Sequence, residues 1–484
     1  MISKGFFKSS VIYTLAGSLP MASAILLMPF YAKFLNTELF GLLSIYFAIA
    51  LLIQILVSFS FDASIYVNYH ERISSPQILA RFLSSMFIFI LMLSLCSGIL
   101  FSLIGSYVFV YFFSYQLPFF PFGILTISTG IFQAILKVNN SLLQVQEKSI
   151  TFLATNLFSF ALVTIFTLLG LKFFPNTLWG PIGGKLLGVF VCAVWVLGSV
   201  HRKLGLYFDW KLLKPTFGFN LTSLVYQIQQ WFINYFDRPL LLLLISASAV
   251  GYFDLAVKCL LAIDLVLTGL NATIYPKVIG KISKQEAKQS NVEINRYYHG
   301  LTAISIIMVV FSILLFPFII DFFFDKPSFK EAIFIIPFVS TCYLLKPLRF
   351  YFVMPYTAIK YSKPFPWFYL VIMFAKVLMM ISFVPKLGVL GATMAMIISQ
   401  LIELLILYFG IRNRFQFRFN KIKMIFIPSV LLLLIVACEL IIDRSYSLIS
   451  HILYVAIAAL LLTWVYRNEL SLILVKTFSK MRAN

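Results

Sequence analysis

Residues 216–245 read TFGFNLTSLVYQIQQWFINYFDRPLLLLLI, an apolar stretch long enough to cross the hydrocarbon core of a membrane as one helix. Polar residues recur in it at helical spacing and are expected to share one broad face: Asn220, Gln227, Gln230, Asn234 and Arg238. A charge near the bilayer centre costs roughly 2.5–3.5 kcal/mol on insertion scales, so this face must meet protein or water. Two interpretations agree with this requirement: the face could form a polar contact between two packed helices, or it could line a water-filled cavity. Polar faces on other segments favour the cavity.

The composition is that of a polytopic membrane protein. Of the 484 residues, 61% are hydrophobic and only 11% are charged, which is far from the usage of soluble domains. The five cysteines each stand alone in apolar segments, so we expect neither disulfides nor a metal site. The chain contains no GxxxxGK[ST] phosphate-binding loop, and we therefore expect no cofactor and no direct use of ATP.

Fourteen apolar segments predict an all-α protein with fourteen transmembrane helices. They cover residues 10–33, 41–66, 83–112, 118–142, 150–173, 180–200, 216–245, 252–275, 299–320, 331–355, 365–384, 389–410, 424–442 and 450–466. Of the 38 Lys and Arg residues, 25 fall on the N-terminal end, alternate loops and the C-terminal tail, and only six fall on the opposite loops. This positive-inside bias predicts that both termini are cytoplasmic. The net charge of +21 thus reflects membrane topology, and it does not indicate binding to nucleic acid.

Ionisable and amide side chains recur inside several other apolar segments. The intramembrane cations besides Arg238 include Lys137, Lys185, Lys346, Arg349 and Lys376. The intramembrane acids include Asp62, Asp264 and Glu403, and Asp264 has no evident partner on its own helix. Gln54, Ser58 and Asp62 are spaced by four, which predicts one polar face on a single helix over 41–66. Intramembrane ionisable residues are functional-site candidates by default.

Similar short sequence segments occur in both halves of the chain, and each pair is separated by nearly the same number of residues. DASIY at 62–66 matches NATIY at 271–275, Gly41 matches Gly251, and GPIGGK at 180–185 matches GVLGAT at 388–393. The offsets are 209, 210 and 208, which indicates a duplicated six-helix unit in parallel orientation. We expect an N-lobe over 1–212, a C-lobe over 213–420, and two further helices with a cytoplasmic tail over 421–484. Two such lobes are a transporter architecture with the site where the repeats face each other.

These features resemble a known family. FLNTELFGLLSIYFAIA at 34–50, the Asp-Arg pair at 237–238 and VGYFDLAVK at 250–258 are similar to the Wzx-type flippases for O-antigen and other polysaccharide repeat units. Those proteins form the polysaccharide branch of the multidrug/oligosaccharidyl-lipid/polysaccharide (MOP) exporter superfamily, which also includes the MATE drug exporters. The resemblance implies a MATE-like pair of lobes in the bacterial inner membrane. It covers the whole chain through diffuse, apolar motifs.

The resemblance also implies a substrate and a mechanism. The substrate would be an undecaprenyl-diphosphate-linked oligosaccharide of lipopolysaccharide O-antigen or capsule, moved to the periplasmic leaflet by alternating access around a cationic lumen. By matching position, Arg238 and Asp62 correspond to the family's charged lumen residues. Our candidates for contact with the substrate are Arg238, Lys137, Arg349, Lys346, Lys376, Lys185, Gln227, Gln230, Asn234, Gln133 and Asn140. The candidates for carrying a coupling ion, H⁺ or Na⁺, are Asp62, Asp264 and Glu403.

Other functions are weighed against this one. An ion-coupled exporter of cationic drugs would share the twelve-helix core, but its site should be net acidic, and here seven intramembrane cations stand against five acids. Another lipid-linked glycan flippase, such as one for lipid II, also fits. A membrane enzyme such as a repeat-unit polymerase or ligase would need a large outer loop, and the richest outer loop, 321–331, is short. We therefore expect a transporter and not an enzyme, with membrane lipids and other polysaccharide-assembly proteins as its partners.

Overall fold

The computed structural model describes residues 4–284, 292–324, 326–359, 361, 363–441 and 447–467. Over these ranges the chain is almost entirely helical and contains no β-strand, which confirms the all-α class. Ten of the described helices are long and apolar enough to span a membrane. A multi-pass membrane protein is thus confirmed, while the number of fourteen spans and the cytoplasmic position of both termini stay predictions.

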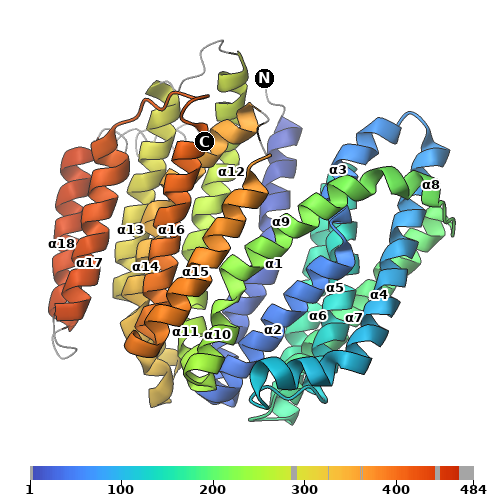
Figure 1. Ribbon diagram of the computed structural model, residues 1–484, viewed down its shortest axis with the longest axis horizontal. Helices are drawn as coiled ribbons and strands as arrows, with labels where there is room; N and C mark the ends of the chain where they lie inside the picture. The colour runs from blue at the N-terminus through green and yellow to red at the C-terminus, as the bar shows by residue number, and fades with distance from the viewer. Residues whose placement is uncertain are drawn as a thin grey trace. The chain divides into compact units, whose positions relative to one another are not determined.

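The chain forms two compact units, Met1–Asp254 and Leu255–Asn484, and each is described by itself. The lobe boundaries expected near 212 and 420 stay predictions. The helices of the first unit are α1 (Lys4–Phe34), α2 (Thr37–Ser58), α3 (Phe61–Arg72), α4 (Pro76–Phe113), α5 (Phe122–Val145), α6 (Ser149–Phe173), α7 (Trp179–Leu204), α8 (Trp210–Leu213), the 3₁₀ turn η1 (Lys214–Thr216), α9 (Phe217–Tyr235) and α10 (Asp237–Leu244) (Figure 1). Helix α11 (Ala247–Cys259) begins in this unit and ends in the next.

Helix α5 is the packing centre of the first unit, because it contacts α2, α3, α4, α6 and α7. Helices α6 and α7 approach each other closely along the glycines in the first half of α7. A Cβ atom on Gly184 would lie 2.4 Å from the Phe166 carbonyl oxygen, and one on Gly188 would lie 2.7 Å from the Cα of Val163. Small residues allow this backbone approach where lipid supplies no hydrophobic driving force.

The segment 41–66 is not the single helix that its spacing predicts. Helix α2 ends at Ser58 and α3 begins at Phe61, because Phe59 and Ser60 adopt left-handed φ angles of 45° and 54°. The expected common face of Gln54, Ser58 and Asp62 is therefore wrong. A non-glycine residue in this conformation is costly, and no Gly or Pro in the sequence marks the break.

The stretch 216–245 is also divided, with α9 ending at Tyr235 and α10 starting at Asp237. Pro239 lacks the N–H group that an unbroken helix would donate to the carbonyl of Tyr235, so the ladder of hydrogen bonds is interrupted there. The expectation of one continuous helix over this stretch is wrong. Both pieces still pack on α2, which keeps them in the first unit.

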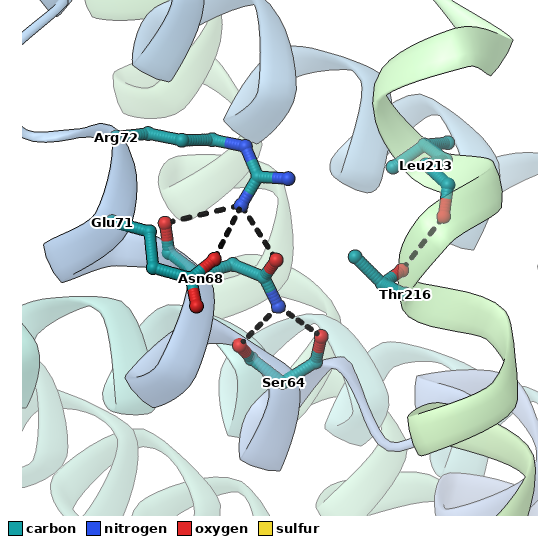
Figure 2. Close-up of polar contacts among 6 residues, drawn as sticks. All are labelled: Ser64, Asn68, Glu71, Arg72, Leu213 and Thr216. Atoms are coloured by element: carbon teal, nitrogen blue, oxygen red, sulfur yellow. Dashed lines mark hydrogen bonds and ion pairs between the residues drawn. The ribbon is translucent and has the colours of Figure 1, made fainter.

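Helix α3 is anchored by a polar ladder along its second half. The Arg72 guanidinium donates to the side-chain oxygen of Asn68 at 2.5 Å, and the Asn68 amide donates to both the carbonyl and the hydroxyl of Ser64 (Figure 2). Arg72 also lies 4.6 Å from the ring centroid of Phe82 on α4. The hydrogen bonds lie within α3 and brace its second half, and the Arg72–Phe82 contact joins that end of α3 to α4.

Trp231 ties α9 to α2 through a hydrogen bond of 2.7 Å from its indole N–H to the Ala48 carbonyl, and its side chain is buried. Trp231→Phe keeps an aromatic ring but removes this hydrogen bond between the two helices, which contributes roughly 0.5–1.5 kcal/mol. We expect a lower melting temperature of the purified protein in detergent. Trp367→Phe, at a residue that is 71% exposed, is the control and should leave the melting temperature unchanged. Equal melting temperatures for all three proteins would contradict a structural role for this bond.

The second unit is also helical over its described residues. Its helices are α12 (Leu261–Lys284), α13 (Val292–Phe323), α14 (Pro327–Ala358), α15 (Phe365–Leu387), α16 (Val389–Ile411), the π-helical turn η2 (Ile422–Phe426), α17 (Ile427–Ile441) and α18 (Ser447–Val465). Helix α14 contacts α12, α13, α16 and α17, and α17 and α18 lie side by side (Figure 1). The segment expected over 252–275 is broken at Leu260, between α11 and α12. The breaks after α2 and after α11 thus fall in the second and eighth predicted spans, which correspond in the proposed repeat.

Candidate functional site

The first unit holds a charged cluster inside its apolar helices. The Lys137 ammonium on α5 lies 3.1 Å from the Asp62 carboxylate and donates to the side-chain oxygen of Gln227 at 2.6 Å. The Gln227 amide in turn donates to the hydroxyl of Ser60 at 3.1 Å. The lysine and aspartate side chains are 25% and 15% exposed, so the pair is partly shielded from solvent. The cluster thus joins the central helix α5 to α9 and to the α2–α3 break.

The helix break positions the acid of this cluster. Because α3 begins at Phe61, Asp62 lies in its first turn, where the positive end of the helix dipole stabilises a carboxylate. Gln54 on α2 donates to the main-chain carbonyl of Gln133 at 3.3 Å, which holds α2 against α5 one turn before Lys137. An unbroken helix would not have this N-terminus beside Lys137.

The second unit contains an ion pair of the same design. The Lys346 ammonium on α14 donates to the carboxylate of Asp264 and to the hydroxyl of Thr268 at 3.2 Å. Asp264 lies in the first turn of α12, directly after the break at Leu260. The side chains of Lys346 and Asp264 are 15% and 31% exposed. Each unit thus carries a lysine from a central helix paired with an aspartate at the start of a broken span.

A second pair lies beside this one. The Arg349 guanidinium donates from Nε to the Glu403 carboxylate on α16 at 2.7 Å, and from a terminal nitrogen to the hydroxyl of Tyr369 on α15 at 3.3 Å. The arginine is 31% exposed and the glutamate only 8%. The arginine side chain is thus partly exposed, and a planar guanidinium of this kind suits phosphate oxygens.

Three ion pairs connect the residues predicted to carry a coupling ion with residues predicted to contact the substrate. The acids Asp62, Asp264 and Glu403 were candidates for the coupling ion, and each contacts a cation that was a candidate for the substrate. The three pairs are Lys137–Asp62, Lys346–Asp264 and Arg349–Glu403. Each candidate for the coupling ion is therefore in contact with a candidate for the substrate. Removing the charge of one residue changes the electrostatic potential at the other.

Arg238 is in a different position from these cations. It is 5% exposed, its Nε lies 3.0 Å from the Asp254 carboxylate, and another nitrogen donates to the Asn234 carbonyl at 2.7 Å. The guanidinium also lies within 6 Å of the ring centroids of Tyr235 and Phe253. Its donors are directed into the protein, an arrangement that ties α10 to α11. Contact between Arg238 and a substrate stays a prediction that this geometry does not favour.

The remaining candidates are spread over several helices. Lys185 on α7 lies 3.7 Å from the ring centroid of Phe47, and Lys376 on α15 is 3% exposed. Asn140 exchanges hydrogen bonds of 3.0 and 3.2 Å with Asn156, an amide pair between α5 and α6. Asn234 is exposed and donates to the Gln230 carbonyl. The Gln230 amide nitrogen and the Gln133 side-chain oxygen are buried without a hydrogen-bond partner. Contacts of these residues with a substrate stay predictions.

Two residues of these clusters are not among those predicted from the sequence. The Ser60 hydroxyl accepts from Gln227, and the Tyr369 hydroxyl accepts from Arg349. Ser60 enters its cluster only because the chain leaves the helix there. No spacing pattern signals such a position. Among the described residues no three His, Cys, Asp or Glu side chains are grouped so that they could hold a metal ion.

Comparison with known proteins agrees with this arrangement. The model of a family described as "Polysaccharide biosynthesis protein" matches residues 6–279, more than half of the chain. The chain belongs to this family. A comparison with the curated proteins found no match.

Solved structures of a lipid II flippase and of MOP superfamily transporters share the fold of this polysaccharide biosynthesis protein. The lipid II flippase MurJ, in an inward closed conformation, is similar over 96% of this chain and 98% of its own, with 18% identity and a TM-score of 0.68. An inward-facing multidrug resistance MATE transporter is similar over 86% of this chain and 95% of its own, with 14% identity and a TM-score of 0.57. A MOP superfamily transporter from Pyrococcus furiosus covers 85% of this chain and 95% of its own, with 14% identity and a TM-score of 0.54.

These identities show the fold alone. Together with the family match, they confirm the resemblance to the polysaccharide branch of the MOP superfamily. The fold is one that solved structures of a lipid II flippase and of MATE transporters also adopt.

Proposed function

We propose that this protein is a flippase that moves an undecaprenyl-diphosphate-linked oligosaccharide from the cytoplasmic to the periplasmic leaflet of the bacterial inner membrane. The cargo is an O-antigen or capsule repeat unit, and the two lobes work by alternating access. The observation that carries the proposal is the Lys137–Asp62–Gln227 cluster within apolar helices of a polysaccharide biosynthesis protein. Its ammonium and amide groups match the two polar parts of such a lipid, the diphosphate and the sugars.

The chemistry of the cargo requires groups of this kind. A diphosphate brings about two negative charges, and moving them through hydrocarbon without compensation is prohibitively costly. Lys137 and Lys346 offer point charges, and Arg349 offers a planar fork that suits phosphate oxygens. The amides of Gln227, Gln230 and Asn234 can donate to and accept from sugar hydroxyls. Transport would draw on an ion gradient, H⁺ or Na⁺, or on the membrane potential.

A second candidate is an ion-coupled exporter of cationic drugs. The observation in its favour is the pairing itself, because each described pair leaves the region around Asp62, Asp264 or Glu403 close to neutral. A cationic drug could then bind an acid whose lysine or arginine had turned away. The flippase remains preferred, because the family match is to polysaccharide biosynthesis proteins.

The deciding experiment is deletion of the gene in its host. Membrane lipids are extracted and analysed for undecaprenyl-linked oligosaccharides, and surface polysaccharide is measured in parallel. The flippase proposal predicts that surface polymer disappears and that the lipid-linked unit accumulates on the cytoplasmic side. Normal polymer combined with reduced efflux of cationic dyes would favour the drug exporter and exclude the flippase.

Lys137→Ala should lower the rate of polymer export about tenfold when it is returned to the deletion strain. A loss of that size corresponds to about 1.4 kcal/mol of interaction with the charged head group. Lys137→Arg keeps the charge and should retain most of the activity. The rate is measured by pulse labelling of surface polysaccharide, at equal amounts of protein in the membrane.

Lys330→Ala is the matched control, because Lys330 forms a half-exposed pair with Asp321 at 2.8 Å, away from both clusters. This variant should export at the rate of the unaltered protein. Full export by Lys137→Ala would count against a cationic substrate site on α5.

A further inference from the structure

We propose that the carboxylates of Asp62 and Asp264 are internal counter-anions, which hold Lys137 and Lys346 between transport cycles and compete with the substrate diphosphate for them. The inference rests on the proposed function and deepens it, because it assigns these acids to substrate release. They would then not serve primarily as carriers of a coupling ion. It follows from the pairing of each acid with one cation of the proposed substrate site.

The first argument is electrostatic. A lysine ammonium that is only 25% or 15% exposed within a membrane helix is costly when it is left alone. The aspartate beside it removes that cost when no diphosphate is near. A transporter that must return without cargo needs such compensation in half of its cycle. The acid therefore has a task that involves no coupling ion.

The second argument concerns how loosely Asp62 is held. One of its oxygens lies near Lys137 and accepts a long contact of 3.5 Å from the Gln227 amide. Its other oxygen is buried and has no hydrogen-bond partner. A carboxylate with a purely structural role normally has both oxygens satisfied. Asp62 is thus a half-satisfied anion, which a diphosphate with more charge and more oxygens can displace from the ammonium.

The third argument is that the arrangement is present twice. Lys137 and Lys346 lie in the fourth and tenth predicted spans, and Asp62 and Asp264 in the second and eighth, each acid in the first turn after a helix break. The first turn of a helix stabilises a carboxylate that has lost its lysine, because the backbone N–H groups and the dipole remain beside it. Each acid can therefore release its cation without becoming an uncompensated charge.

The exchange has a consequence for kinetics. When the diphosphate binds Lys137, the Asp62 carboxylate is free, and its return to the ammonium helps to expel the diphosphate. Removing the carboxylate's charge should therefore strengthen substrate binding and slow release. A carrier of a coupling ion predicts a different result, in which substrate affinity is unchanged and the dependence of transport on the ion gradient is lost.

The test uses the purified full-length protein in nanodiscs, with farnesyl diphosphate as a short polyprenyl diphosphate probe. Affinity is measured by titration for the unaltered protein, Asp62→Asn, Lys137→Ala and the double variant. We expect Asp62→Asn to bind about fivefold to tenfold more tightly, and Lys137→Ala and the double variant to bind more weakly than the unaltered protein. In export assays, Asp62→Asn should lower both the half-saturating substrate concentration and the maximal rate.

Asp264→Asn gives an independent measurement at the similar pair of the second unit, should Asp62→Asn fold poorly. Asp321→Asn removes a carboxylate from a half-exposed pair and is the matched control, with no expected change in affinity. Unchanged or weaker binding by both Asp62→Asn and Asp264→Asn would overturn the inference and leave the proposed function standing. If the unaltered protein and Lys137→Ala bound the probe equally, or neither bound it, the proposed function would fail and the inference with it.

Discussion

Arg238→Ala is expected to lower the free energy of unfolding by about 3–5 kcal/mol and to reduce the amount of folded protein in the membrane. Arg238 and Asp254 have side chains that are only 6% and 3% exposed, and they lie 3.0 Å apart. Removing one partner leaves the other charge buried without compensation. The fall in export would then follow from the loss of folded protein, and not from a lost contact with the substrate.

Three further variants separate this explanation from a direct role in binding. Arg238→Lys keeps the charge but loses the second donor, so it should recover part of the stability. The double variant Arg238→Ala with Asp254→Asn removes both charges and should be more stable than Arg238→Ala alone. Thermal unfolding in detergent and the yield of monodisperse protein measure these effects as a double-mutant cycle.

Lys330→Ala breaks a half-exposed ion pair and sets the scale, because such pairs contribute at most about 1 kcal/mol. If Arg238→Ala left the melting temperature unchanged and abolished binding of the diphosphate probe, the structural interpretation of Arg238 would be wrong. The residue would then belong to the substrate site that the family resemblance implies.

Gly41→Ala and Gly251→Ala are each expected to destabilise the protein by about 3 kcal/mol, the upper end of the usual range for overpacking. A Cβ atom on Gly41 would lie 2.0 Å from the Ala247 carbonyl oxygen, and one on Gly251 would lie 2.1 Å from the Thr37 carbonyl oxygen. The clash is with backbone atoms, which cannot move aside as the end of a flexible side chain can. Helices α2 and α11 would have to separate.

The crossing of these helices is reciprocal. Thr37 and Gly41 are separated from Ala247 and Gly251 by the same 210 positions, which lies within the offsets of the predicted internal repeat. Residues that correspond in the predicted repeat thus face each other where α2 and α11 cross. Both substitutions should have similar effects, because each introduces the same clash from the opposite helix.

Gly183→Ala is the control for this pair, since a Cβ atom on Gly183 meets nothing within 4 Å. Alanine there should be neutral or slightly stabilising, because it favours the helix more than glycine does. The measurement is again the melting temperature, together with the yield of folded protein. Melting temperatures for Gly41→Ala and Gly251→Ala equal to that of Gly183→Ala would show that the two helices can separate at little cost.

The all-α class, the multi-pass membrane character and the family resemblance all followed from the amino-acid sequence. Hydrophobicity along the chain is a local property, and a span of about 20 apolar residues has few alternatives in a bilayer. The sequence also identified the ionisable residues Asp62, Lys137, Asp264 and Lys346 as unusual, because charges inside apolar segments are expensive wherever they lie.

Only the tertiary structure decided which of these residues act together. The pairs Lys137–Asp62, Lys346–Asp264 and Arg349–Glu403 join residues 75, 82 and 54 positions apart. The spacing of polar residues along one helix carries no information about their partners on another helix. The sequence therefore predicts the substrate-binding and ion-coupling residues as two separate sets.

The helix breaks were decided in the same way. Phe59 and Ser60 hold left-handed conformations that their residue types do not favour, and the break moves Asp62 off the expected face and beside Lys137. Arg238 shows the converse. The sequence presented it as the most prominent cation of a polar face, and the packing of α10 on α11 buried it against Asp254. Such outcomes depend on the balance between local conformational cost and contacts made across the fold, and only the folded chain sets that balance.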